Sequence, residues 1–219
     1  MESRLFTFEA HLDEEQSTLW AGLNSPAKVQ AFLDNIPYAP EERNRCPLNV
    51  LRDRRGHCLD GGLFAAAALR QLGNPPVIVD LLPEEGTDDD HVLAIYKLNG
   101  FYGAVAKSNF VGLRFRDPVY RTLRELVMSY FEVFFNIHGA KTLRAYTTPL
   151  NLNRYDPQGW LWNDAAADAI EVRLKTLRQI PVVTPSMVTY LSPVDVRSYE
   201  AGMLGANPDG LYVPQEDRP

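Results

Sequence analysis

The stretch between residues 58 and 107 changes its hydrophobic period from helical to strand-like, and this change restricts the folds open to the chain. Its first part, CLDGGLFAAAALRQLGN, carries apolar residues at helical spacing and reaches Gly73, a residue typical of helix ends. PPVIVDLL then has the β-branched composition of a strand, and HVLAIYKL and FYGAVAK flank the Asn99-Gly100 pair that favours a hairpin turn. A helix followed by antiparallel strands predicts an α+β fold, in which the helix that begins at Cys58 packs on an antiparallel sheet.

Further helices are expected on both sides of this unit. Ser25 and Pro26 suit the N-cap and the first position of a helix in SPAKVQAFLDNIP, and a short helix is expected over residues 49–54. DPVYRTLRELVMSYFEVFFN predicts one long helix over residues 117–136, NDAAADAIEVRLKTLRQI predicts a surface helix, and LRAYTTPLNL predicts a strand. Four aromatic residues of the long helix are at helical spacing and are expected in the core rather than in a ligand-binding box: Tyr130, Phe131, Phe134 and Phe135.

Composition indicates one globular domain with appended segments. Of the 219 residues, 45% are hydrophobic and 23% are charged, and no shift in composition separates two cores. We expect a single domain over residues 1–180, with its core at about 46–120, followed by an irregular arm rich in Pro and Gly over residues 181–219.

The charge balance and the cysteine count exclude several classes of partner. A net charge of −6 gives no electrostatic attraction for nucleic acid or an anionic membrane, and the basic clusters adjoin acidic residues. No apolar run reaches membrane-spanning length, and the first residues do not resemble a secretion signal, so a cytoplasmic location is expected. Cys46 and Cys58 are too few for a disulfide framework, and we expect two free thiols, no metal site and no cofactor.

Cys58 is the first candidate for chemistry, because its thiol stands at the start of the strongest predicted helix. The positive end of the helix dipole and its free N–H groups favour a thiolate, and those N–H groups can hold an oxyanion. Arg54, Arg55 and His57 add positive charge nearby, whereas Asp60 opposes it. The glycines that follow would leave room for a substrate. The alternative is a buried structural thiol, because free cysteine is among the most buried residue types.

A nucleophilic thiol needs a base, and His91 is the candidate because it begins a strand expected beside the cysteine helix. A third group should orient the imidazole. Asn109 lies near the level of His91 across the predicted hairpin, with Ser108 and Asp117 as alternatives. His57 is a rival base, but neighbours along a chain seldom present their side chains to each other, so it is interpreted as a pocket-wall residue.

VLRDRRGHCLDGGLFAAAALRQLGNPPVIVDLL followed by DHVLAIYKLNGFYGAVAKSNF resembles the core of the transglutaminase-like superfamily of cysteine enzymes. That pattern has a Gly-x-Cys at a helix start, an apolar helix before a strand, and a histidine that opens a hairpin strand with an acidic residue at the end of the return strand. The resemblance covers roughly residues 49–110 and rests on Gly56, Cys58, Leu69, Arg70, Gly73 and His91. Two features depart from it: AKSNF offers Ser108 or Asn109 instead of the usual aspartate, and Val92 and Leu93 replace the aromatic residue that often follows the histidine.

The resemblance implies a papain-like fold and acyl transfer from an amide or ester through a thioester. Cys58 would be the nucleophile, His91 the base and Asn109 the orienting residue, in a peptidase, amidase or transglutaminase-type enzyme. An acyltransferase that uses a thioester donor is a further option, although the chain lacks a Gly-rich phosphate loop. The substrate would be a peptide, a protein or a small amide. The alternative is a catalytically inactive transglutaminase-like binding module, which the missing aspartate favours; oligomeric state is left open.

Overall fold

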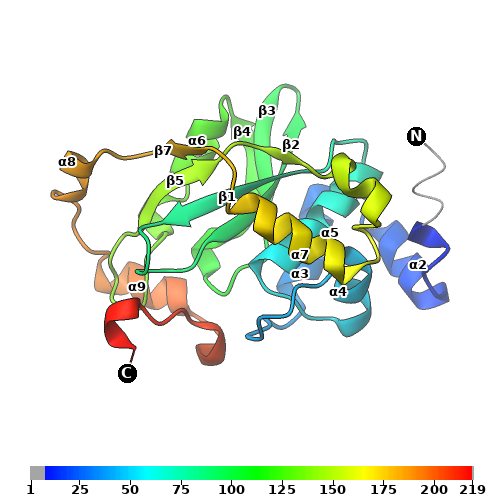
Figure 1. The fold of residues 1–219 in the computed structure, drawn as a ribbon, viewed down its shortest axis with the longest axis horizontal. Coiled ribbons are helices and arrows are strands. Elements are labelled where there is room, and N and C mark those ends of the chain that lie inside the picture. The colour runs from blue at the N-terminus through cyan, green and yellow to red at the C-terminus, as the bar shows by residue number, and fades with distance from the viewer. Residues whose placement is uncertain (1–7, 219) are drawn as a thin grey trace.

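Residues 8–218 are described by a computed structural model, in which helices cover both faces of one antiparallel sheet (Figure 1). This architecture confirms the predicted α+β class. The helices are α2 (Glu14–Gly22), α3 (Pro26–Asp34), α4 (Pro47–Asp53), α5 (Cys58–Gln71), α6 (Leu123–Met128), α7 (Asp164–Leu174), α8 (Pro185–Val188) and α9 (Val196–Met203). The strands are β1 (Val77–Pro83), β2 (His91–Leu98), β3 (Phe101–Val105), β4 (Arg116–Tyr120), β5 (Leu143–Thr147), β6 (Leu150–Asn151) and β7 (Gln179–Pro181).

The sheet has the strand order β4-β3-β2-β1-β5-β7, and β6 also pairs with β1. The predicted hairpin forms within this sheet. Strands β2 and β3 pair with each other and turn at Asn99 and Gly100, which both have positive φ. Asp80 of β1 lies opposite Val92 of β2, and the next pair along the ladder joins Leu81 to His91. Since side chains alternate between faces along a strand, this register decides which residues meet the cysteine helix.

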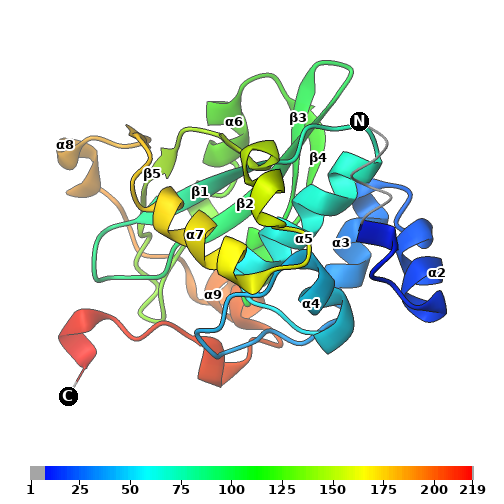
Figure 2. The ribbon, with the colours of Figure 1, turned by 45° about the vertical axis from the view of Figure 1, so that its right-hand side comes forward.

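Helix α5 forms where the alanine-rich run predicts it, and it is the buried central helix of its layer. Gly73 follows its end with a φ of +87°. Figure 2 shows α5 among α3, α4 and α7, with which it is in contact. Its apolar side chains pack against one face of the sheet, which includes Ile78, Val92 and Ala94.

The opposite face of the sheet has its own core, built with α6 and the short turns that follow it. Val79, Leu81 and Leu93 point to this side. The aromatic run predicted as core is buried, as expected: Tyr130, Phe131, Phe134 and Phe135. The prediction of one helix over residues 117–136 was wrong, because its first part is strand β4, its middle is α6, and Phe131–Val133 is a 3-10 turn. Pairing with β3 outweighs the helical period there.

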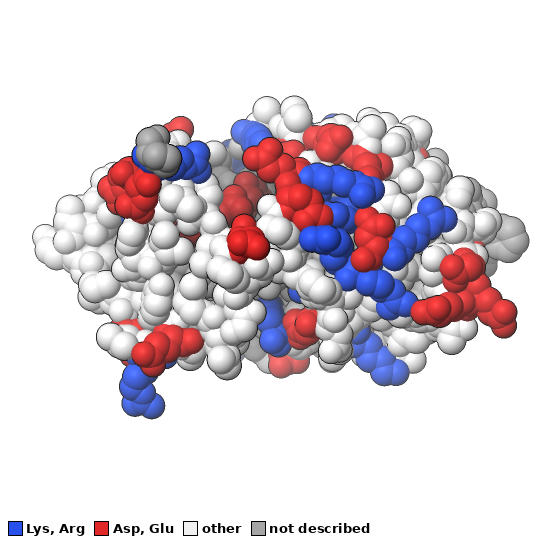
Figure 3. Space-filling view, turned by 90° about the horizontal axis from the view of Figure 1, so that it is seen from below, with Lys and Arg blue, Asp and Glu red and all other residues white. Residues whose placement is uncertain are grey.

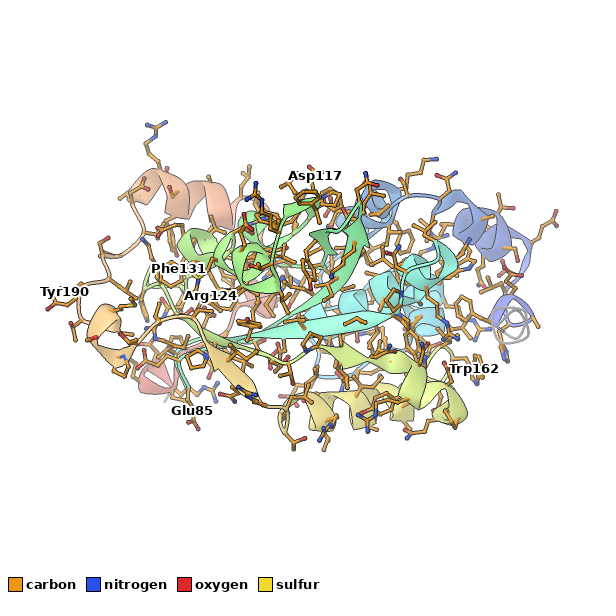
Figure 4. All side chains as sticks on the ribbon, turned by 90° about the horizontal axis from the view of Figure 1, so that it is seen from above. Glu85, Asp117, Arg124, Phe131, Trp162 and Tyr190 are labelled. Carbon is orange, nitrogen blue, oxygen red and sulfur yellow. The ribbon has the colours of Figure 1, made fainter. Side chains whose placement is uncertain are left out.

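The chain after residue 181 is less irregular than predicted. It contains α8 and α9, and then a C-terminal segment (residues 204–218) that lies along the bottom of the molecule in Figure 1 and reaches the loop between β1 and β2. In that segment the Gln215 N–H donates to the Gly86 carbonyl at 2.8 Å, and the Asn207 amide donates to the Tyr38 carbonyl at 3.3 Å. Tyr190, between α8 and α9, projects from the end of the molecule (Figure 4). None of the helices within residues 8–218 has the length and apolar character needed to cross a bilayer.

Candidate functional site

Cys58 is the first residue of α5, as predicted, but the glycines beside it do not leave room for a substrate. A Cβ at Gly61 would lie 2.1 Å from the Lys107 Cβ, and a Cβ at Gly62 would lie 2.6 Å from a methyl group of Val92. The two glycines therefore let α5 approach β2 and the end of β3 closely. Cys58 itself is only 7% exposed.

The surroundings of the Cys58 sulfur favour the neutral thiol. The S–H group donates to the Asp90 backbone carbonyl, with an S···O distance of 3.8 Å. Burial raises the pKa of Cys58 well above its ordinary value, and the negative charges of Asp90, Asp89 and Asp80 raise it further. These effects outweigh the helix dipole, so the expected thiolate is not favoured in this structure.

The arginines expected to activate the thiol are engaged elsewhere. Arg54 pairs with Glu15 at 3.1 Å, and Arg55 pairs with Glu41 at 2.9 Å. Figure 3 shows the molecule from below. On this face, most Lys and Arg side chains lie next to Asp or Glu side chains. The basic clusters of the sequence are thus locally neutralised.

His91 and Cys58 line different cavities, and the expected hydrogen bond between them is not formed in the described residues. Val92 packs against α5, so its neighbour His91 points to the other face of the sheet. There the His91 Nε2 donates to the Leu113 carbonyl at 2.6 Å, and the ring is 3% exposed. Burial lowers the pKa of His91 to about 4, so the ring is neutral near pH 7.

The expected orienting residues lie on the His91 side and have structural partners. His91, Ser108 and Asn109 line a small cavity of about 40 Å³ that Cys58 does not reach. The Asn109 side chain holds the C-terminal segment, because its Oδ1 accepts from the Asn207 N–H at 2.8 Å and its Nδ2 donates to the Asn207 carbonyl at 2.9 Å. The Ser108 hydroxyl accepts from the backbone of Phe110. The third alternative, Asp117, is exposed on the outer strand β4 (Figure 4).

His57, the rival base, lines the same cavity as Cys58 and belongs to a polar network at the start of α5. Its Nε2 lies 3.2 Å from Asp60 Oδ1 and 3.2 Å from the Arg43 carbonyl. Asp60 is fully buried, and it accepts the backbone N–H of Arg45 at 2.6 Å and an Arg45 guanidinium N–H at 3.3 Å. The acid that seemed to oppose activation therefore anchors the loop before α4.

Cys58 opens onto a cavity of about 780 Å³, a volume typical of small-molecule sites. Its wall is strongly acidic and includes Asp80, Asp89 and Asp90. Tyr38 and, from the C-terminal segment, Tyr212 complete it. Burial raises the pKa of Tyr38, and the charges of Asp89 and Asp90 raise it further.

Sequence reasoning missed most of this wall. One signal was present, because Asp80 interrupts the apolar strand VIVDLL, and a carboxylate inside a buried strand is unusual. Tyr38 and Tyr212 had no such signal, since only the tertiary fold brings their distant segments together. Within residues 8–218, no three His, Cys, Asp or Glu side chains are grouped so that they can hold a metal ion.

Comparisons with known proteins add no family assignment. Neither protein-family models nor curated proteins give a significant match to the chain.

Proposed function

We propose that the chain is a transglutaminase-like binding module, which holds a ligand in the cavity beside Cys58 and does not carry out acyl transfer. The observation that carries this proposal is the orientation of His91, whose ring bonds the Leu113 carbonyl and lines a different cavity from Cys58. No hydrogen bond joins the Cys58 sulfur to a histidine nitrogen among the described residues, so the thiol lacks the partner that would take its proton during attack on a carbonyl.

The state of Cys58 supports the same conclusion. A nucleophilic cysteine acts as the thiolate, but here burial and three neighbouring aspartates raise the pKa of the thiol. Its S–H group also donates to the Asp90 carbonyl, a contact that only the protonated form makes. The cysteine then serves as part of the cavity wall.

The resemblance to the transglutaminase-like superfamily supports the architecture of the module. A helix that begins with Cys58 packs on an antiparallel sheet. In that sheet, β2 begins at His91 and forms a hairpin with β3. AKSNF lacks the aspartate that is usual in the superfamily, which agrees with a site that has lost catalytic activity. Acyl transfer by Cys58 with His91 as base is the competing proposal.

The rate of Cys58 alkylation by iodoacetamide between pH 4 and 10 distinguishes the two proposals. Cys46→Ala provides the background, although burial already raises the pKa of Cys46 to about 12. We expect slow alkylation of the native protein below the ordinary thiol pKa of about 8.5, and the same profile for His91→Gln and His57→Gln. The unfolded protein in urea gives the reference rate of an accessible thiol.

Fast alkylation that persists several pH units below 8.5, and that either histidine variant abolishes, would show a thiolate–imidazolium pair. That result would overturn the binding-module proposal in favour of acyl transfer. A profile indifferent to both histidines supports the binding module, because it shows that neither ring shares a proton with the sulfur.

A further inference from the structure

The cavity beside Cys58 contains more negative than positive charge. Two of its glutamates are neutralised, because Glu41 pairs with Arg45 and Arg55, and Glu171 pairs with Lys175. In the described part of the chain, no lysine, arginine or histidine nitrogen lies within 4.0 Å of a carboxylate oxygen of Asp80, Asp89 or Asp90. These three unpaired carboxylates come from two different elements, β1 and the loop before β2.

Asp80 provides an independent sign that a ligand is missing from this wall. It lies in the middle of β1, its side chain is 2% exposed, and it lines the cavity. A hydrogen bond from the His91 backbone lowers the pKa of the Asp80 carboxyl group, but its Oδ1 atom is buried without a hydrogen-bond partner. A buried acceptor of this kind costs about 1–3 kcal/mol, and more when it is charged, so a donor is expected from outside the chain.

The electrostatics of the cluster indicate the sign of that ligand. Burial and the charge of Asp89 together raise the pKa of Asp90 to about 7. The pKa of Asp80 is raised by burial and then by the charges of Asp90 and Asp89. Lys175, already bonded to Glu171, opposes these effects only in part. These raised pKa values follow from burial and uncompensated negative charge, which a bound cation would relieve.

We infer that the cavity binds an organic cation with two or more ammonium groups, in which one ammonium bonds Asp80 and another is held by Asp89 and Asp90. This inference rests on the proposed binding function and names its ligand class. An ammonium group presents up to three N–H donors and so can satisfy a buried carboxylate oxygen. The two tyrosine rings in the wall, Tyr38 and Tyr212, suit the alkyl chain and cation of such a ligand.

A polyammonium ligand fits the wall better than a metal ion does. No group of three metal-ligating side chains exists among residues 8–218, so the carboxylates do not converge on one point. The three carboxylates line a cavity of about 780 Å³. A cavity of this size has room for the alkyl chain of a polyammonium ligand.

Spermidine is the probe, and its binding is measured by isothermal titration calorimetry at low ionic strength. We expect saturable binding that falls at least tenfold in Asp80→Asn and in Asp90→Asn. Asp117→Asn is the matched control, because this exposed aspartate lies on β4 away from the cavity, and it should leave the affinity unchanged. 1,4-Diaminobutane should bind more weakly than spermidine, and its neutral isostere 1,4-butanediol should not bind.

Titrations at pH 7 in HEPES and in PIPES add a readout that is specific to the cluster. Because Asp90 has a raised pKa of about 7, a bound ammonium should displace its proton, and roughly half a proton should be released at that pH. Proton release should become smaller in Asp90→Asn, which removes the contribution of Asp90 and leaves that of Asp80, whose pKa is also raised.

Absence of spermidine binding, equal weakening by Asp117→Asn, or tighter binding of Mg²⁺ than of spermidine would overturn the inference. Each of these results leaves slow alkylation of Cys58 untouched. Conversely, fast histidine-dependent alkylation removes the binding-module proposal whatever the calorimetry shows. The two proposals therefore fail in separate experiments.

Discussion

Replacement of Gly61 by alanine tests whether α5 depends on its close approach to the end of β3. The new Cβ would lie 2.1 Å from the Lys107 Cβ and 3.2 Å from the Lys107 Cα. Carbon atoms pack best at about 3.5–4.0 Å, so the first contact is short by more than about 1 Å. Both obstructing atoms are at or next to the backbone, and no rotation of the Lys107 side chain removes them.

The cost follows from two opposing effects. Overpacking of this kind costs about 1–3 kcal/mol, and an unyielding backbone contact belongs at the upper end. Alanine returns about 1 kcal/mol through its higher helix propensity. We therefore expect Gly61→Ala to lower the free energy of unfolding by about 2 kcal/mol, which corresponds to a shift of about 1 M in the urea midpoint for a slope of about 2 kcal/mol/M.

Two matched variants make the urea measurement decisive. Gly62→Ala should be milder, because its nearest obstruction is a side-chain methyl of Val92 at 2.6 Å. Gly22→Ala, at the exposed end of α2 with no atom within 4 Å, should be neutral or stabilising by up to about 1 kcal/mol. If Gly61→Ala were as stable as Gly22→Ala, the close approach of α5 to Lys107 would be refuted.

Three further variants test contacts of the site. The pKa of His91 is lowered from 6.5 to about 4, so the unfolded chain binds more protons between these values, and wild-type stability falls as pH drops through that window. His91→Gln should not show this loss. In urea titrations, its free energy of unfolding should rise by about 3 kcal/mol relative to that of the wild type as the pH falls from 7 to 4. Parallel pH profiles of the two proteins would contradict this prediction. Asp60→Ala leaves Arg45 without one buried partner and should cost about 3–5 kcal/mol; a loss below about 1 kcal/mol would argue against the network. Asn109→Ala removes both hydrogen bonds to Asn207, so hydrogen exchange of the Asn207 backbone amide, measured by NMR, should become roughly tenfold faster. An unchanged exchange rate would show that other contacts hold the C-terminal segment.

The parts of the fold that local signals control were predictable from the sequence. Ser25 caps α3 and Pro26 is its first residue, as expected. The Asn99-Gly100 turn and the helix that begins at Cys58 also form where they are predicted. In each case the deciding residues are neighbours in the chain, so their effect does not depend on the rest of the fold.

The orientation of His91 was not predictable, for a physical reason. The first six residues of β2, HVLAIY, are all buried, because the strand has a core on each face. A strand without polar alternation carries no signal for the face on which a given side chain lies. The pairing of Asp80 with Val92 determines it, and that register forms only in the folded sheet.

Two other errors have the same origin in long-range contacts. Residues 117–136 have a helical period, yet residues 116–120 pair with β3 because the sheet has an open edge there. Asn109 was expected beside His91, and it does line that cavity, but its side chain bonds Asn207, 98 positions later. A local sequence pattern cannot predict a hydrogen-bond partner that is so far away along the chain.

The outer strands of the sheet have a consequence for the behaviour of the protein at high concentration. Edge strands with free N–H groups can recruit strands from other copies and begin aggregation. At one edge β4 contains Pro118 next to Arg116 and Asp117, and at the other β7 is short and ends at Pro181. Proline offers no N–H for a ladder, and charged residues disfavour the stacking of identical edges. Growth of fibrils by edge-to-edge addition should therefore be suppressed on both sides of this sheet.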